Sequence, residues 1–257
     1  MKFALHAKPG RMALFLWFFL CACGGHEEHL LSGKTMGTTY HVKLVAGRSL
    51  DLAAVQAKVE ACLARVNQSM STFRPDSEIS RFNALERADE PLAISADFLR
   101  VMQAAQEIYL LTAGAWDGSV DPLVNLWGFG KAGPLRQLPA AEAVQRARQA
   151  VGFDRIVIDA GGRLSKKRPD VALDLASIAK GYGVDQVAAV LGELGFKDYL
   201  VEIGGEVYAA GVRPDGMPWR VGINRPEAAA ALDAVYKVVR LRNQAMATSG
   251  DYRNFYQ

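Results

Sequence analysis

Apolar residues recur along this chain with two periods, and each period predicts a different kind of element. Helical spacing, with apolar residues every three or four positions, runs over 50–67, 95–112 and 140–151. The same spacing follows Gly183, over residues that share one helix face: Val184, Val187, Val190, Leu191 and Leu194. These four segments predict amphipathic helices that pack on a sheet.

Strand patterns fill much of the remaining sequence. Tyr40, Val42 and Leu44 alternate with polar residues, and 156–158 and 171–173 flank a turn that the glycines of DAGGRL permit. Three or four more strand patterns come late in the chain, in YLVEIGGEVYAAG, WRVGIN and ALDAVYKVVRL. Because helices and strands do not alternate strictly, we predict an α+β fold of a single domain, with mainly antiparallel sheets and packed helices.

Two segments interrupt these patterns. In SMSTFRPDSEISRFN, over 69–83, Pro75 and many hydroxyl groups predict a structured loop, in which Phe73 either fills the core or stacks on a ligand. AGAWDGSVDPLVNLWGFG, over 113–130, combines glycines with two tryptophans and two aspartates. That composition is compatible with a lined pocket and equally with a glycine-rich corner of the core.

The stretch VALDLASIAKGYG is the one around which the other unusual residues gather. An apolar run ends at Asp174 and a helical pattern follows, so Asp174 or Ser177 is the predicted N-cap. A helix N-terminus offers backbone N–H groups and a positive dipole, and Lys180 adds a point charge, so this junction suits an anionic group such as a phosphate. The alternative is an ordinary capped helix packed on a sheet.

Two glycines close the same stretch. Gly181 and Gly183 each weaken a helix by about 1 kcal/mol relative to alanine. Something other than helix stability favours them, such as close approach of the backbone to a ligand or a neighbour.

The first 22 residues have the pattern of an export signal. Three basic residues precede an apolar run, over 12–22, that is too short to span a bilayer. The run ends in LCAC, which resembles a bacterial lipobox and predicts cleavage before Cys23 and lipidation of Cys23; a plain signal peptide is the alternative. We therefore expect a tether over 23–32 and a domain over 33–257, exported, lipid-anchored to a bacterial membrane and facing the periplasm.

The charge balance bears on the kind of partner, and the cysteine content bears on disulfide bonds. Removing 1–22 leaves 27 basic and 27 acidic residues, so nothing in this balance favours nucleic acid as a partner. Cys62 is then the remaining free thiol, so we expect no intramolecular disulfide. Its helical setting predicts a buried, inert cysteine.

The sequence lacks the motifs of several common types of catalytic and binding site. The sequence has no zinc-ligand spacing, no Walker-type phosphate loop, no complete dinucleotide fingerprint and no credible histidine base for a serine triad. What remains is an oxygen-rich set of carboxylates and hydroxyls with one lysine. That set suits Mg²⁺ and a phosphate ester better than a softer metal.

Six sequence blocks, taken in order, carry a resemblance to a known family. They are MGTTY (36–40), STFRPDSEISRFN (71–83), GAWDGSVDPLVNLWGFG (114–130), LDLASIAKGY (173–182), EIGGE (202–206) and ATSGDYRNF (247–255). Together with the lipobox they closely resemble the FAD:protein FMN transferases, the ApbE-type periplasmic lipoproteins, over essentially all of the mature chain.

The resemblance implies a reaction, its cofactor and its partners. The family splits FAD at its pyrophosphate with Mg²⁺, places FMN on a threonine of an acceptor flavoprotein, and releases AMP. The implied partners are FAD, such an acceptor (for example a subunit of a membrane redox complex) and the membrane, through the lipid anchor.

The resemblance also implies site residues. Seven residues match FAD-contacting positions: Met36, Phe73, Ala115, Trp116, Asp117, Asp174 and Lys180. Phe73 stands where an aromatic residue lies near the flavin. Ser177 matches the position whose backbone oxygen ligates Mg²⁺.

One departure bears on the metal site. In the family, the block like ATSGDYRNF is followed by a segment with a histidine, Asp-Pro, a threonine and a glycine, whose aspartate and threonine complete the magnesium site. This sequence stops at Gln257, before that segment, which favours a truncated sequence over a binding remnant. Two other functions stay open: a non-catalytic periplasmic FAD-binding carrier, and an FAD pyrophosphatase in which water replaces the threonine.

Overall fold

A computed structural model describes residues 26–131, 133–135, 137–227 and 234–250. Its elements follow in chain order: β1 (His26–Thr35), β2 (Thr38–Gly47), α1 (Leu52–Met70), α2 (Glu78–Asn83), α3 (Ala96–Leu111), α4 (Asp121–Leu126), α5 (Ala141–Ala150), η1 (Phe153–Arg155), β3 (Ile156–Ile158), β4 (Leu164–Lys166), α6 (Ala176–Glu193), β5 (Tyr199–Ile203), β6 (Glu206–Ala210), β7 (Trp219–Asn224), β8 (Val235–Leu241) and β9 (Gln244–Met246). The predicted α+β class, with antiparallel sheets, is confirmed.

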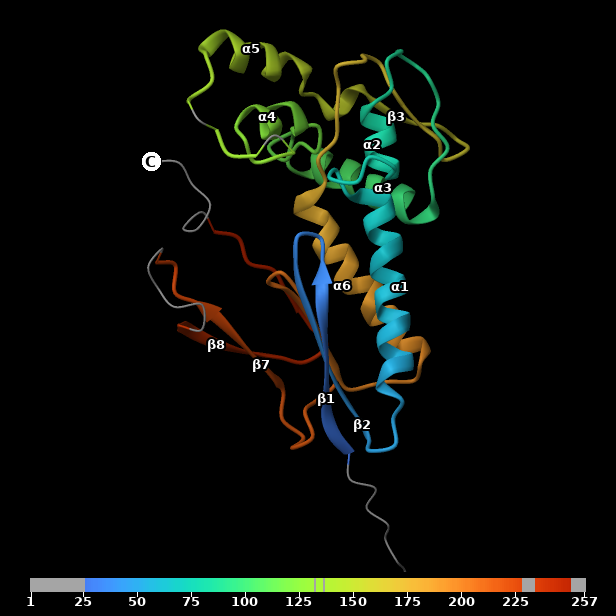
Figure 1. Cartoon of the computed structure of the whole chain (residues 1–257), viewed down its shortest axis with the longest axis vertical. Coiled ribbons are helices and arrows are strands. Elements are labelled where there is room, and N and C mark those ends of the chain that lie inside the picture. The colour runs from blue at the N-terminus through green and yellow to red at the C-terminus, as the bar shows by residue number, and fades with distance from the viewer. Residues whose placement is uncertain (1–25, 132, 136, 228–233, 251–257) are drawn as a thin grey trace, which may run out of the picture.

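A five-stranded antiparallel sheet forms the centre of the fold, in the order β1-β2-β5-β6-β9. The inward residues of β2 alternate as predicted, with Tyr40, Val42 and Leu44 almost fully buried. They pack under α1 and α6, which run side by side across one face of the sheet (Figure 1). Cys62 of α1 lies in this core as a free, buried thiol, as predicted.

The N-terminal strand corrects one prediction. The segment 26–32, predicted to be part of a tether, lies in β1, which pairs with all ten residues of β2. Leu31 is the buried residue within that segment, and the exposed positions hold His26, Glu28, Leu30 and Ser32. Pairing with β2 satisfies the backbone groups of β1 that face β2, and polar side chains are common on such an edge strand.

The opposite face of the central sheet is covered by the β7–β8 hairpin (Figure 1). Trp219 and Leu241 of this hairpin pack against Leu200 and Val207 of the sheet, which forms a second apolar layer. The Trp219 indole N–H donates a hydrogen bond to the Ala210 carbonyl, at 2.8 Å, so the buried ring keeps its polar group satisfied.

A third apolar cluster holds the other end of the molecule, where α2, α3 and the β3–β4 hairpin surround the ends of α1 and α6. The predicted partner of 156–158 was wrong: β3 pairs with β4, and Val171 to Leu173 lies outside that hairpin. Ala172 instead forms an isolated bridge with Val120. The segment 69–83 is a loop only in its middle, since α1 extends to Met70 and α2 begins at Glu78.

Lys166 is the unexpected member of this region, because its side chain is fully buried. Its ammonium group donates to the carbonyls of Asn83, Pro169 and Val171 at 2.9–3.1 Å. Burial lowers the pKa of Lys166. The lysine therefore ties three segments together in the interior.

Within the described residues, none of the helices has the length and apolar character needed to cross a membrane.

Candidate active site

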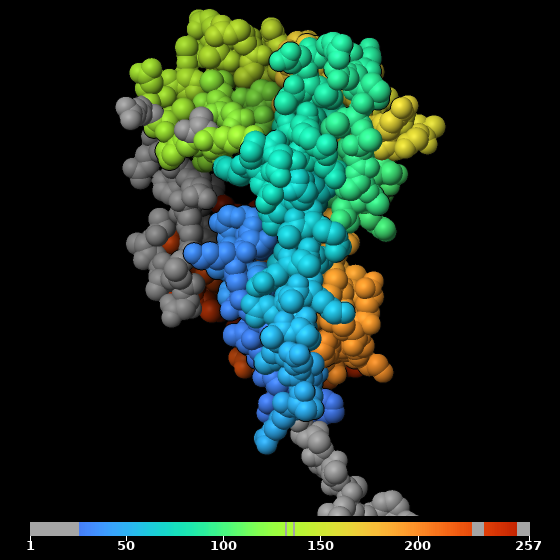
Figure 2. Space-filling view, turned by 45° about the vertical axis from the view of Figure 1, so that its right-hand side comes forward, coloured from blue at the N-terminus to red at the C-terminus, as the bar shows by residue number. Residues whose placement is uncertain are grey.

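A pocket of about 290 Å³ opens where three parts of the chain meet. These are the β1–β2 turn, the end of α1 with the loop after it, and the first two turns of α6. In Figure 2 the tip of the β1–β2 hairpin, in blue, lies beneath the teal loop that follows α1. Four of the predicted site residues line this pocket: Met36, Phe73, Asp174 and Lys180. Ala115, Trp116, Asp117 and Ser177 are not among its lining residues.

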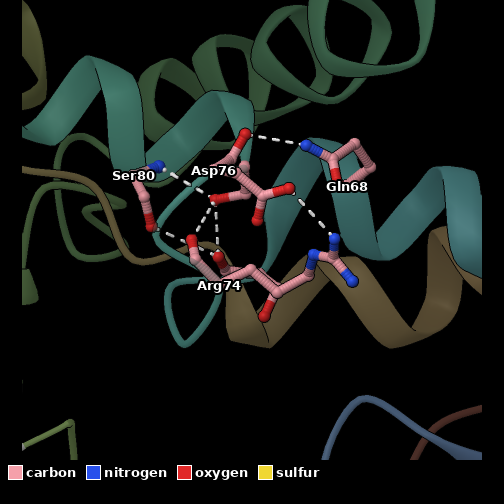
Figure 3. Close-up of polar contacts among 6 residues, drawn as sticks. Gln68, Arg74, Asp76 and Ser80 are labelled. Atoms are coloured by element: carbon pink, nitrogen blue, oxygen red, sulfur yellow. Dashed lines mark hydrogen bonds and ion pairs between the residues drawn. The ribbon is translucent and has the colours of Figure 1, made fainter.

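Phe73 stands at the pocket on a loop that is held by its own polar groups. The Ser77 hydroxyl donates to the carbonyls of Ser71 and Arg74, at 2.7 and 2.9 Å, and accepts from the Ser80 N–H at 3.1 Å. Figure 3 shows these contacts together with the Gln68 amide, which donates to the Asp76 carbonyl at 2.7 Å. The Phe73 side chain is 69% exposed, so it does not fill the core. A braced loop that presents an exposed ring favours the stacking role.

The start of α6 differs from the predicted cap. The N-cap residue is Leu175, not Asp174 or Ser177, and its side chain makes no capping bond. The Asp174 carboxylate nevertheless accepts a hydrogen bond from the Ala176 N–H at 2.8 Å, which is the role of a cap performed from one position earlier. The Asp174 N–H donates to the Gly118 carbonyl at 2.9 Å. This bond joins the helix start to the glycine-rich 113–130 segment.

Trp116 and Ser177 lie together behind this junction. The Trp116 indole N–H donates to the Ser177 hydroxyl oxygen at 3.1 Å. The ring also packs edge-on against Phe153, with centroids 5.9 Å apart. A Cβ on Gly118 would lie 2.8 Å from the Trp116 ring, so the glycine makes room for it. The indole therefore fixes the first turn of α6 from the side.

Asp117 is engaged by protein donors. One carboxylate oxygen accepts from the Ser119 N–H at 2.8 Å and from its hydroxyl at 2.6 Å, and the other accepts from the Phe153 N–H at 3.2 Å. The fully buried Ser119 hydroxyl in turn accepts from the Gly152 N–H at 2.7 Å. Asp117 thus joins the 113–130 segment to the segment before β3.

Lys180 has a partner that sequence reasoning missed. Its ammonium group lies 2.9 and 3.0 Å from the two carboxylate oxygens of Glu206, on β6. It also lies 3.5 Å from the Gly204 carbonyl in the β5–β6 turn. The block EIGGE contains this carboxylate, but nothing in its spacing indicates that α6 and β6 would bring the two charges together.

Asp121 is a second residue that the sequence did not single out. Burial, with a further contribution from the charge of Asp174, raises the pKa of Asp121 to about 6. Lys131 and a hydrogen bond from the Asn125 amide, at 2.8 Å, act in the opposite direction. The charge of Asp174, a residue of the pocket lining, therefore acts on the carboxyl group of Asp121, which is not among the lining residues.

The site has an apolar and a polar side, which determines what it can bind. Met36 and Phe73 supply surface for a planar ring, and Lys180 supplies a cation for a phosphate. Within the part of the chain that the structure describes, the pocket lining carries one carboxylate, Asp174, and one cation, Lys180, so a diphosphate would need a further positive charge nearby. Among the described residues, no group of three or more His, Cys, Asp or Glu side chains could hold a metal ion. Mg²⁺ commonly uses one or two carboxylates and the substrate phosphates, so the oxygen donors at the start of α6 fit it in kind.

Comparison with known proteins gives one consistent result. The family model described as the ApbE family matches residues 36–257. A protein of Haemophilus influenzae named FAD:protein FMN transferase is 42% identical over 254 residues, which span 96% of this chain and 73% of that protein. The flavin transferase ApbE structure from Vibrio cholerae is 41% identical, with a TM-score of 0.82 over 90% of this chain and 74% of that one. The apo flavinyl transferase ApbE of Pseudomonas stutzeri is 39% identical, with a TM-score of 0.79 over 90% of this chain and 72% of that one.

Proposed function

The chain belongs to the ApbE family and is a flavin transferase, and we propose that it cleaves FAD at the pyrophosphate with the help of Mg²⁺. In this reaction FMN becomes attached through a phosphoester to a threonine hydroxyl of an acceptor flavoprotein, and AMP leaves. The threonine oxygen bonds to the phosphorus of the FMN half as the bond between that phosphorus and the AMP phosphate oxygen breaks, and the hydroxyl proton passes to the departing AMP phosphate or to solvent.

The observation that carries the proposal is that Met36, Phe73, Asp174 and Lys180 line one pocket together. At about 290 Å³ it lies near the lower end of the roughly 300–1,000 Å³ that ligand pockets occupy, so a dinucleotide would extend beyond it. An exposed aromatic ring on a braced loop supports stacking on the flavin. Phosphoryl transfer depends mainly on positioning and charge, and these residues supply both.

Each residue has a distinct part in this proposal. Phe73 stacks on the flavin ring and Met36 packs against it, which orients the dinucleotide and excludes water from its apolar end. Lys180, which is paired with Glu206, binds the phosphates. Trp116 and Asp117 support the pocket without lining it, because their polar groups form hydrogen bonds with protein atoms at the start of α6 and before β3.

Mg²⁺ belongs to the proposal as well. The backbone oxygen of Ser177 would contribute to its site, beside Asp174 at the start of α6. When bound, the ion would offset the negative charge that builds on the phosphates as AMP departs. The single lysine in the described lining of the pocket, which is already paired with Glu206, supports the need for such a cation.

The cellular location is a further proposal, which rests on the sequence. Residues 1–22, the proposed signal peptide, and Cys23, the proposed lipidation site, lie outside the described residues. We propose that the mature protein is exported and lipid-anchored, facing the periplasm, where an acceptor in a membrane redox complex would be within reach. Labelling cells with a fatty-acid probe, and comparing the wild type with Cys23→Ala, tests this proposal; equal labelling would contradict it.

The activity test uses the purified chain with FAD, Mg²⁺ and an acceptor domain that carries the target threonine. Covalent yellow acceptor with an equal amount of AMP is the expected result. Free FMN with AMP would instead indicate a pyrophosphatase, and unchanged bound FAD would indicate a carrier. An acceptor whose threonine is replaced by alanine is the control, because it can bind but cannot accept FMN.

A further inference from the structure

The β1–β2 turn places a methionine in an unusual backbone conformation at the pocket. Met36 has φ 49° and Gly37 has φ 72°, as a two-residue type I′ turn requires. Asparagine, aspartate and glycine favour such positions, and a long apolar side chain does not. The side chain of Met36 is one wall of the pocket, which gives a reason for a costly residue in this turn.

The side chain of Met36 rests against a glycine of α6. A Cβ on Gly183 would lie 2.8 Å from the Met36 methyl carbon and 3.7 Å from its sulfur. The same Cβ would lie 3.2 Å from the Cδ1 of Ile203, which is fully buried in β5. The thioether therefore occupies space that any other residue at 183 would fill.

We propose that Gly183 is a positioning residue for the flavin pocket, because its missing side chain provides the seat on which Met36 rests. The inference rests on the proposed function, since it assigns the pocket to FAD. Ile203 cannot yield without disturbing the sheet core, whereas the methyl group of Met36 is the far end of a flexible side chain. A methyl group added at 183 would therefore displace the side chain of Met36. The resulting rearrangement would alter the pocket and leave the core packing around Ile203 in place.

The same helix offers a matched control. Gly192 also lies within α6, and a Cβ there would meet nothing within 4 Å. Both Gly183→Ala and Gly192→Ala replace a helical glycine with a better helix former. Only Gly183→Ala adds an atom against a pocket residue. A difference in FAD affinity between the two variants therefore comes from the contact with Met36 and not from helix propensity.

The experiment measures FAD affinity by fluorescence titration and thermal stability for both variants. We expect Gly183→Ala to weaken FAD binding at least fivefold with a Tm within a few degrees of the wild type. Gly192→Ala should keep the wild-type affinity and an equal or higher Tm. Wild-type affinity in Gly183→Ala would overturn the proposal.

A double-mutant cycle with Met36→Ala tests whether the effect passes through Met36. In the Met36→Ala background, the further change Gly183→Ala should alter FAD affinity less than twofold. An equal fivefold loss in both backgrounds would overturn the proposal. If Gly183→Ala alone fails to fold, recovery of folding in the double variant supports the seat, and failure of both variants overturns it.

A spectroscopic readout separates this inference from the proposed function. The Met36 methyl signal in a [methyl-¹³C]methionine NMR spectrum is assigned by its absence in Met36→Ala. It should move in Gly183→Ala and stay in place in Gly192→Ala, with or without FAD. A wild-type protein that binds no FAD would contradict the proposed function, whereas an unmoved Met36 signal in Gly183→Ala would contradict the seat.

Discussion

Lys180 and Glu206 form an ion pair at the edge of the pocket, with the ammonium nitrogen 2.9 Å from one carboxylate oxygen and 3.0 Å from the other. The pair joins α6 to β6, and the negative charge of Glu206 offsets the positive charge of the ammonium group that faces the pocket. A phosphate that binds Lys180 must therefore compete with a carboxylate already in place.

Removing that competition gives the first prediction. Glu206→Gln keeps a hydrogen-bonding partner for Lys180 and removes the charge, so FAD should bind about two- to fivefold more tightly, since a partly exposed ion pair is worth up to about 1 kcal/mol. A fluorescence titration at two salt concentrations measures the gain, which should shrink at high salt. The control is Glu28→Gln, which removes the partner of Lys43 in an ion pair between β1 and β2. Weaker binding in Glu206→Gln would mean that the carboxylate is needed to orient Lys180.

Phe73 should matter for the ligand and not for the fold. Because its ring is 69% exposed, Phe73→Ala should leave the Tm almost unchanged. FAD affinity should fall roughly tenfold, since an aromatic stacking contact contributes on the order of 1 kcal/mol beyond the area it buries. Leu111→Ala, which truncates a 77% exposed apolar side chain away from the pocket lining, is the control. Equal affinity in the two variants would exclude stacking on Phe73.

Asp117 should matter for stability. Its carboxylate satisfies three protein donors, and one of them is the hydroxyl of the fully buried Ser119. Asp117→Ala should lower the free energy of unfolding by about 1–3 kcal/mol, because those donors lose their acceptor. Urea denaturation measures the loss. Asp159→Ala removes a comparable carboxylate from an exposed turn and should cost less; an equal loss would show that burial at Asp117 has no special effect.

Asp121 should make stability depend on pH. Its folded-state pKa of about 6 lies above the value of 3.8 that an unburied aspartate has, so the folded protein binds more protons than the unfolded chain between these values. The stability that Asp121 contributes is therefore greatest below the lower value and is lost as the pH rises through about 6. Asp121→Asn should raise the free energy of unfolding at pH 7.5 and leave it nearly unchanged below pH 4. Urea denaturation of both proteins over pH 4–8 checks this, and a difference between variant and wild type that does not grow with pH would contradict it.

The helices and most strands could be predicted from the sequence because their signals are local. Apolar periodicity located α1, α3, α5 and α6 to within a few residues, and the alternation around Tyr40 located β2. The polar edge strand β1 was missed for a related reason. Its exposed positions carry charged residues on both sides of Leu31, and only its pairing with β2 identifies it as a strand.

Lys166 illustrates a different failure. In the sequence SKKRPD, Lys166 has the charged neighbours of a surface lysine, yet its side chain is fully buried. The backbone carbonyl of Asn83, from a distant segment, converges on its ammonium group with the carbonyls of Pro169 and Val171, a few residues further along the chain. That convergence depends on how α2 and the chain before α6 cross, and no local pattern records it.

The sequence alone determined the family resemblance, the helix that begins near Asp174 and the set of residues expected around the ligand. The tertiary structure decided which of them share a pocket, and it placed Met36, Phe73, Asp174 and Lys180 together while turning Asp117 toward protein donors. It also paired Lys180 with Glu206 and seated Met36 on Gly183. The physical reason is that periodicity and capping act within a few residues, whereas charge pairing and side-chain fit depend on distances between segments that only the packed chain sets.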